Sequence, residues 1–226
     1  MKHFTLGIMM PAGIFAATTQ MALAQGTLYT SRALFEQQLS SRTTITMESL
    51  QASSDADFVW GLGQPNITVS GVSFLSPPGR RLFVSNPGHL AYPIPGDGQY
   101  IFNSDSFTPV SIQLPAGVTG FGADLSGSTV NPTFDATLTV NLAGGGSYDY
   151  TFVGSRGSWT FFGVTFPEPI ASLIYSDYNG APSAVHGEKL DNVTFGAIPE
   201  PGAFGLLALG SFLLSGRRRY SARFSL

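Results

Sequence analysis

The chain has 226 residues and contains no cysteine. Disulfide bonds, cysteine-ligated zinc, iron–sulfur clusters and thiol nucleophiles are therefore excluded. Charged residues make up only 11% of the chain and the formal net charge is −3, so a basic nucleic-acid-binding surface is not expected. Histidine is scarce too. Beyond the first 24 residues only His89 and His186 occur, both in segments rich in Gly and Pro, which disfavours a zinc enzyme.

Motifs of the common catalytic sites are also missing. The sequence has no Gly-x-Ser-x-Gly, no His-Glu-x-x-His, no phosphate-binding glycine loop and no EF-hand loop. A glycan hydrolase remains an alternative, because it needs only two facing carboxylates and the chain has fourteen acids. The sequence places no such pair, so we expect a protein that is not an enzyme.

What the chain does contain is apolar and turn-forming residues. Hydrophobic residues make up 43%, with eighteen Phe, and there are 27 Gly and 15 Pro. This composition predicts a folded, turn-rich chain rather than a disordered one, and the length fits one domain or at most two.

The first 24 residues have the pattern of a signal peptide. Lys2 and His3 precede an apolar stretch, Phe4–Ala17, and a small-x-small site follows at Ala22 and Ala24. An N-terminal helix is the alternative, but the three features agree with one another. We expect export and cleavage by signal peptidase after Ala24.

The C-terminal residues 198–223 form a second ordered pattern. Pro199-Glu200-Pro201 is followed by an uncharged, mostly apolar run, Gly202–Gly216, and then by Arg217-Arg218-Arg219. Fifteen residues are short for a transmembrane helix, which needs about 20. The arginines would stay on the cytoplasmic side and leave Pro199 outside.

This tail resembles the PEP-CTERM sorting signal of exported proteins of Gram-negative bacteria. The resemblance implies recognition by an exosortase-type protease, transient residence in the inner membrane, and transfer of the body to the cell surface or extracellular matrix. A plain C-terminal membrane anchor is the alternative and predicts the same topology. Between Gln25 and Glu200 the body keeps six basic residues and all fourteen acids, a net charge of −8. Such an acidic surface disfavours adhesion to phosphate-rich polymers.

Residues 25–197 are predicted to form one all-β domain. Phe134, Ala136, Leu138, Val140 and Leu142 alternate with polar residues, and the alternation resumes after Gly144-Gly145-Gly146 at Tyr148, Tyr150 and Phe152, which is typical of a hairpin. Besides a short strand at 27–29, further strands are expected at 43–50, 67–75 with a bulge at Gly71, 82–85, 99–102, 110–114, 118–125, 158–166, 171–175 and 189–195. One short helix is expected from a Ser31 cap to Leu39, with Leu34, Phe35 and Leu39 facing inward. The fold predicted is an antiparallel β-sandwich, jelly-roll-like.

One acid stands out in the last predicted strand. Period-2 counting places Asp191 on the face of Val193 and Phe195, where a carboxylate needs a partner. At Leu190-Asp191-Asn192-Val193 the body resembles carbohydrate-binding jelly rolls and other PEP-CTERM bodies. There an acid of the first strand, matched by Glu48, and an Asp of the last strand, matched by Asp191, flank a structural calcium. A hydrogen-bonded structural Asp is the alternative, and Asp124 is a weaker candidate ligand.

Exposed aromatic residues could stack on sugar rings. Trp159 and Tyr178 adjoin loops rich in Gly and Ser and are the candidates for carbohydrate binding. Tyr148, Tyr150 and Phe161 alternate along strands and are expected in the core. Two functions thus remain: a non-catalytic structural protein of the envelope or matrix, or a module that binds exopolysaccharide.

Overall fold

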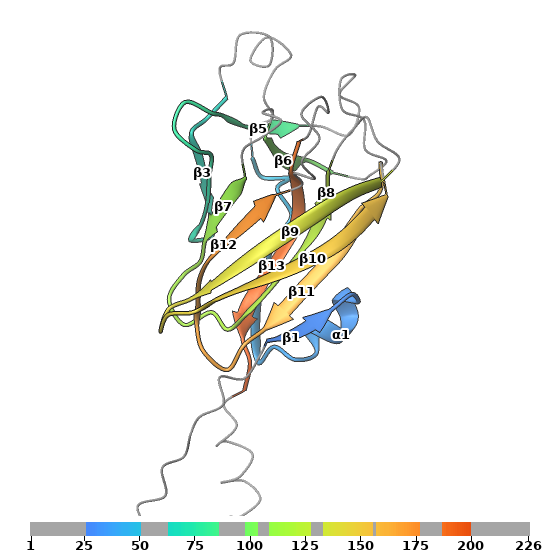
Figure 1. Ribbon diagram of the computed structural model, residues 1–226. Helices are drawn as coiled ribbons and strands as arrows, with labels where there is room; N and C mark the ends of the chain where they lie inside the picture. Colours follow the sequence, from blue (N-terminus) through green and yellow to red (C-terminus); the bar gives the residue numbers. More distant parts are fainter. Residues whose placement is uncertain are drawn as a thin grey trace, which may run out of the picture.

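The computed structural model describes residues 26–50, 63–85, 98–103, 109–127, 133–155, 157–176 and 187–199, and Figure 1 shows their arrangement. They form thirteen strands and one short helix. The elements are β1 (Thr27–Tyr29), α1 (Arg32–Glu36), β2 (Ser41–Ile45), β3 (Asn66–Val69), β4 (Val72–Leu75), β5 (Leu82–Ser85), β6 (Tyr100–Asn103), β7 (Val110–Gln113), β8 (Gly120–Ser126), β9 (Thr133–Leu142), β10 (Ser147–Ser155), β11 (Thr160–Thr165), β12 (Ile170–Ser176) and β13 (Lys189–Ala197).

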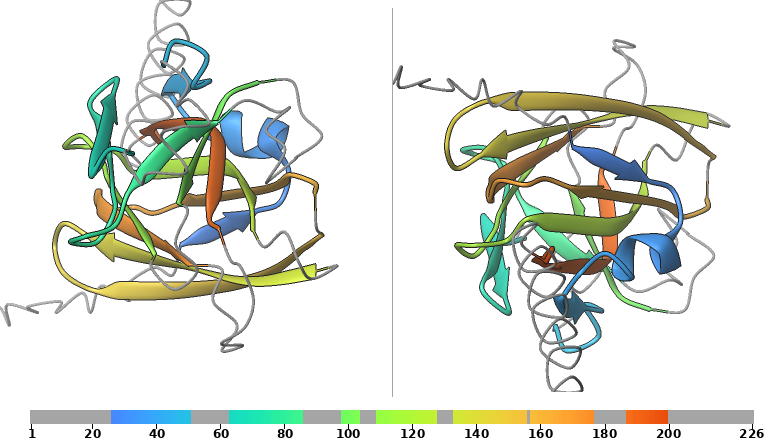
Figure 2. Two further views of the ribbon diagram at one scale, coloured as in Figure 1. Left: turned by 90° about the horizontal axis from the view of Figure 1, so that it is seen from above. Right: turned by 90° about the horizontal axis from the view of Figure 1, so that it is seen from below.

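The strands belong to two sheets, seen end-on in Figure 2. Sheet A has seven strands in the order β1-β11-β8-β13-β6-β5, with β2 also paired to β13. Sheet B has six strands in the order β10-β9-β12-β7-β4-β3. All strand pairs in both sheets are antiparallel. The predicted all-β antiparallel sandwich is confirmed.

Alternation along β9 and β10 sets the core between the sheets. The even-numbered residues of β9, from Phe134 to Leu142, are at most 7% exposed. Tyr148 and Tyr150 of β10 pack against this core, and the ring of Tyr150 lies 5.7 Å from that of Phe162. The two strands pair over nine residues, which confirms the predicted hairpin. The core positions predicted for Tyr148 and Tyr150 are confirmed too.

The stretch 67–75 forms two strands rather than one bulged strand. Ser70 and Gly71 have φ angles of 50° and 80°, and Val69 pairs with Val72 across them. Two consecutive residues with positive φ make the tight turn that suits a two-residue hairpin. The predicted bulge at Gly71 is therefore wrong, because the shift of the apolar phase marks a reversal of the chain.

The predicted strand at 43–50 ends early. β2 stops at Ile45, and Met47 has a φ of 58°, in the left-handed region. The backbone then turns, with Leu50 N donating to Met47 O at 2.9 Å. Met47 is still fully buried, so the turn keeps an apolar side chain in the core.

Helix α1 lies against the outer face of sheet A and differs from the prediction in detail. Phe35 is fully buried, whereas Leu34 is 57% exposed, so the inward orientation predicted for Leu34 is wrong. Consecutive side chains of an α-helix point about 100° apart, and Phe35 is the buried residue of α1. Leu39 is half-buried beyond the helix end, and the Ser31 side chain makes no capping hydrogen bond.

Both ends of the described fold lie at one end of sheet A, which we call the tail end. Thr27 is opposite Thr165, which is opposite Gly120, and Gly120 is opposite Gly196, which is opposite Arg42. Figure 1 shows the start of β1 and the end of β13 there. No helix in the described ranges is long and apolar enough to cross a membrane. The predicted transmembrane stretch 202–216 lies outside those ranges.

Candidate functional site

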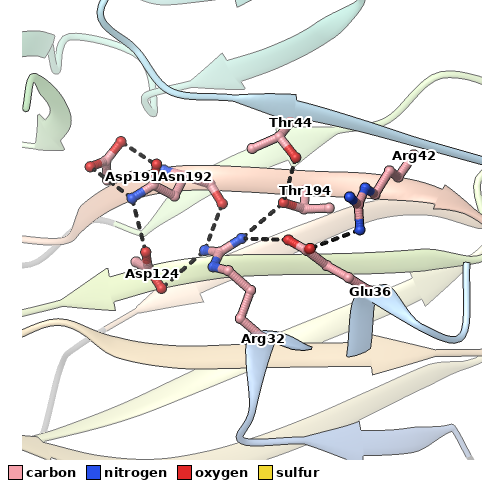
Figure 3. A network of polar contacts seen from close by, with 8 residues as sticks. All are labelled: Arg32, Glu36, Arg42, Thr44, Asp124, Asp191, Asn192 and Thr194. Atoms are coloured by element: carbon pink, nitrogen blue, oxygen red, sulfur yellow. Dashed lines mark hydrogen bonds and ion pairs between the residues drawn. The ribbon is translucent and has the colours of Figure 1, made fainter. Parts of the chain in front are cut away.

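Arg32 of α1 is the centre of a polar network on the outer face of sheet A (Figure 3). Its Nη2 lies 3.0 Å from Asp124 Oδ1 of β8 and donates to the carbonyl oxygen of Asn192 at 2.9 Å. Its Nη1 donates to Thr194 Oγ1 at 2.9 Å, and the guanidinium lies 4.6 Å from the ring centroid of Phe161. One side chain thus ties the helix to three strands. Phe161 therefore lies on the outer face and not in the predicted core position.

Three more side chains extend this network, which we call the Arg32 network. Glu36 Oε1 lies 3.7 Å from Arg32 Nη1, and Arg42 Nη1 donates to Glu36 Oε2 at 2.9 Å. Thr44 Oγ1 lies 3.0 Å from Thr194 Oγ1. Charges of opposite sign alternate along it, and each carboxylate shown has a basic or amide donor beside it. The arrangement is that of a structural network.

A bulge in β13 determines where Asp191 lies. Asp191 is opposite Asp124, but Thr194 is opposite Gly122, so β13 has one extra residue between these pairs. Asn192 has a φ of 47° at this point. Opposed residues share a face, and Asp124 alternates with core residues of β8, so Asp191 lies on the outer face. Its predicted place on the core face with Val193 and Phe195 is wrong, because the bulge reverses the alternation.

Asp191 is nonetheless only 3% exposed, and its carboxylate accepts hydrogen bonds from Asn192. The Asn192 backbone N donates to Oδ1 at 2.6 Å, and its Nδ2 donates to Oδ2 at 3.3 Å and to Asp124 Oδ2 at 3.0 Å. These bonds fit the alternative of a hydrogen-bonded structural Asp. The Asn192 amide also joins two carboxylates that would otherwise repel each other.

Glu48, the other predicted calcium ligand, is exposed at the turn after β2. Its Oε1 accepts a hydrogen bond from the backbone N of Gln99, just before β6. No described contact joins Glu48 to Asp191, and the described residues contain no group of three His, Cys, Asp or Glu that could hold a metal. At Asp124 the positive charge comes from Arg32. Calcium at Glu48 and Asp191 stays a prediction.

Trp159, a predicted carbohydrate contact, is half-buried at the start of β11. Its ring stands edge-to-face to Tyr100 of β6, with centroids 5.7 Å apart. Since β8 and β13 separate β11 from β6, the two rings meet across these strands, where Lys189 and Asp191 are buried. Burial raises the pKa of Tyr100 above its ordinary value, and a hydrogen bond with Ser85 opposes part of that rise. The phenol therefore stays neutral at physiological pH.

The outer face of sheet B carries a second arrangement, which the sequence reasoning missed. One row of directly opposed residues crosses all six strands, and every member has a neutral polar side chain. This polar row consists of Ser147, Asn141, Ser172, Gln113, Ser73 and Thr68. All six are exposed or half-exposed. The adjacent row has hydroxyl groups at Thr139 and Ser111 on either side of Ile174, and Thr139 Oγ1 donates to Asp149 Oδ1 at 2.6 Å.

Hydrogen bonds hold parts of this face in place. Asn141 Nδ2 lies 3.3 Å from Ser172 Oγ, and Thr68 Oγ1 lies 2.9 Å from Ser73 Oγ. Strands lie about 4.8 Å apart, so the polar row presents donors and acceptors at a regular spacing over about 24 Å. The sequence contained the signal, since Ser, Thr and Asn occupy the outward positions of each strand. Only the register shows that they line up.

Two hollows lined by described residues have at most one acidic side chain each in their lining. One of about 230 Å³ lies at the tail end beside Arg42 and Ala197 and contains no acid. The other, of about 360 Å³, lies on the outer face of β9 and β10 and contains one acid, Asp135. Neither offers the two facing carboxylates of a glycan hydrolase.

Most of the predicted sorting and cleavage residues lie outside the described ranges. They are Ala22, Ala24, Glu200, Pro201 and Arg217–Arg219, and Tyr178 is also outside. Pro199 is the last described residue, two positions after the end of β13. At that point Ile198 N donates to Thr119 Oγ1 at 2.7 Å, and Ser40 N donates to Ala197 O at 2.8 Å. The chain is thus held to the sandwich up to the predicted sorting motif.

Neither known protein families nor curated proteins give a match. No family model matches the chain. No curated protein matches it either.

Solved structures give matches at the level of overall shape. A cleaved adhesin domain of Lys-gingipain from Porphyromonas gingivalis is similar over 70% of this chain and 99% of its own, at 10% identity and a TM-score of 0.44. A family 29 carbohydrate binding module complexed with mannohexaose is similar over 70% of this chain and 92% of its own, at 11% identity and a TM-score of 0.42. A xylan-binding domain from Paenibacillus barcinonensis is similar over 55% of this chain and 85% of its own, at 12% identity and a TM-score of 0.38.

Proposed function

We propose that this chain is an exported, non-catalytic surface or matrix protein whose sandwich binds neutral polysaccharide along the polar row of sheet B. The proposal includes the jelly-roll form of the sandwich, the signal peptide and the exosortase-processed tail. The polar row is the observation that carries the binding function. An extended chain of neutral sugars offers repeated hydroxyl groups, and an uncharged row of amides and hydroxyls can pair with them without burying a charge.

The position of the two chain ends supports display at a surface. The first strand starts at Thr27, two residues after Gln25, which is the first residue after the predicted cleavage. The last strand ends at Ala197, two residues before Pro199. Both ends lie at the tail end of sheet A, so one end of the sandwich would face the membrane during sorting. All six residues of the polar row on sheet B are exposed or half-exposed, as contact with a polymer requires.

Processing at both ends is tested by the intact mass of the natural protein from cell-surface and culture-medium fractions. We expect a mass that begins at Gln25 and ends near Pro199-Glu200-Pro201. Signal peptidase and an exosortase-type protease would make these two cuts. A mature protein that retains Arg217–Arg219 contradicts the sorting part of the proposal and leaves polysaccharide binding to be judged separately.

Polysaccharide binding is tested by affinity electrophoresis with a β-glucan, a xylan, a mannan and, as an acidic polymer, alginate. We expect at least one neutral polymer to retard the protein. The double variant Asn141→Ala/Gln113→Ala should weaken that binding about tenfold or more, because each lost hydrogen bond contributes about 0.5–1.5 kcal/mol.

The matched control removes two exposed amides from the turn after α1, on the side of sheet A. Gln37→Ala/Gln38→Ala should bind like the wild type. If no polymer retards the wild type, the binding function fails. If Asn141→Ala/Gln113→Ala binds normally while Trp159→Phe does not, the site lies at the predicted aromatic residue and not on the polar row.

A further inference from the structure

Strand β10 forms an unusually long free edge of sheet B. It has nine residues and pairs with β9 alone (Figure 1). The strands at the other three ends of the two sheets, β1, β5 and β3, have three, four and four residues. Long edges are templates for pairing with another chain, and proteins usually keep them short or covered.

The backbone of β10 has hydrogen-bonding groups that point away from β9. Leu142 N donates to Gly146 O at the turn, and hydrogen-bonded pairs alternate along an antiparallel ladder. The even-numbered residues of β10 therefore bond to β9. The N–H and C=O groups of Asp149, Thr151 and Val153 point to the free edge, and these three side chains are exposed.

The usual protection of an edge strand is missing from β10. Its sequence, SYDYTFVGS, has no proline and no lysine, and Asp149 is its one charge. The register with β9 is continuous over nine pairs, so no bulge bends the strand away. Val153 is 65% exposed, the largest exposure among the large hydrophobic residues described.

The other face of β10 carries aromatic side chains that are only half-buried. Tyr150 and Phe152 point into the sandwich and pack on its core. Because β10 is the last strand of sheet B, no described strand lies beside it on the side away from β9. A strand added there would cover these rings and bond to the backbone at the same time.

We propose that β10 pairs antiparallel with β10 of a second copy of this chain, which joins two sheets B into one continuous sheet. In the register that uses all nine residues, Thr151 lies on the two-fold axis opposite Thr151 of the second copy. Asp149 is then opposite Val153 of the second copy, and Tyr150 is opposite Phe152 of the second copy. The register that opposes Asp149 to itself is disfavoured by like charges.

Such a dimer satisfies the symmetry of the commonest homo-oligomers, because one patch meets its own copy. It also brings two polar rows onto one surface, so a long polymer could contact both copies and bind with higher avidity. Dimer formation itself does not depend on polysaccharide, and it is measured without any.

The cysteine-free chain allows a direct test by single-cysteine variants of the full protein. Under mild oxidation Thr151→Cys should form a disulfide-linked dimer in high yield, because the two sulfurs meet across the axis. Asp149→Cys and Val153→Cys should each link poorly, whereas the double variant Asp149→Cys/Val153→Cys should link well. Equal linking by all the single variants would show random collisions and overturn the register.

Solution mass by light scattering gives an independent readout. We expect a dimer for the wild type, with a dissociation constant at least tenfold higher for Thr151→Lys, which places two lysines face to face. Thr137→Lys adds the same charge to the directly opposed residue of β9 and should leave the dimer intact. A monomeric wild type, or a dimer that Thr151→Lys does not weaken, overturns the proposal.

Discussion

Phe35→Ala is expected to lower the free energy of unfolding by about 3–5 kcal/mol, the range for removal of a fully buried Phe side chain. Phe35 is 0% exposed although it lies on the outer face of sheet A. Its ring is 5.8 Å from the rings of both Tyr29 and Phe161. Urea unfolding monitored by tryptophan fluorescence measures the change. The loss should separate α1 from the sheet, because no other residue of the helix is buried.

The neighbouring residue provides the matched control. Leu34 is 57% exposed, so Leu34→Ala should change the free energy of unfolding by less than about 0.5 kcal/mol. The sequence predicts similar losses for both, since it places both side chains inward. Equal losses for Leu34→Ala and Phe35→Ala would therefore contradict the described packing of α1.

The reason why Phe35 fits where it does lies in the glycines of sheet A. A Cβ atom at Gly122 would lie 2.8 Å from the Phe35 ring, and one at Gly163 would lie 2.9 Å from it. These two glycines are directly opposed on β8 and β11. They leave a depression that only the observed register assembles. The sequence shows the glycines but gives no reason to connect them with a residue more than 80 positions earlier.

Strand positions were predictable because alternation is a local property. In β9 the polar and apolar residues alternate without interruption, so the buried face follows from the sequence alone. Asp191 shows the limit of this reasoning. One extra residue at Asn192 reverses the face of everything before it, and the bulge depends on pairing with β8. The hydrogen bonds of Asn192 to Asp191 and Asp124 stabilise that bulge. The sequences of β8 and β13, each read alone, do not predict it.

The polar row illustrates the same limit at a candidate site. Each of its members is an ordinary outward-facing residue of its own strand, such as Asn141 or Gln113. Their alignment depends on five separate strand registers. Aromatic residues such as Trp159 attract attention in a sequence because of their chemistry. A surface built from common hydroxyl and amide side chains becomes visible only when the strands are placed side by side.

Arg32→Ala is expected to lower the free energy of unfolding by about 2–3 kcal/mol. The substitution removes two hydrogen bonds and two ion pairs of a side chain that is 28% exposed. Loss of one partner from a fully buried pair costs about 3–5 kcal/mol, and the partial exposure of Arg32 reduces this figure. Asp124 and Asp191 would then face each other with only the Asn192 amide between them. Arg32→Lys should recover little, since an ammonium cannot reach several acceptors with a fixed fork.

Arg42→Ala is the matched control, because it also removes an arginine that binds Glu36. The Arg42 side chain is 56% exposed, and its ion pair at 2.9 Å is on the surface, so the loss of this pair should lower the free energy of unfolding by no more than about 0.5 kcal/mol.

The calcium prediction is tested by unfolding the wild type and Arg32→Ala with Ca²⁺ and with EDTA. If calcium binds at Glu48 and Asp191, EDTA should lower stability equally in both proteins, because Arg32 neutralises Asp124 and not the predicted ligands. If EDTA changes the stability of neither protein, the calcium prediction is wrong. If Arg32→Ala and Arg42→Ala both lower the free energy of unfolding by the same small amount, the Arg32 network does not stabilise the fold.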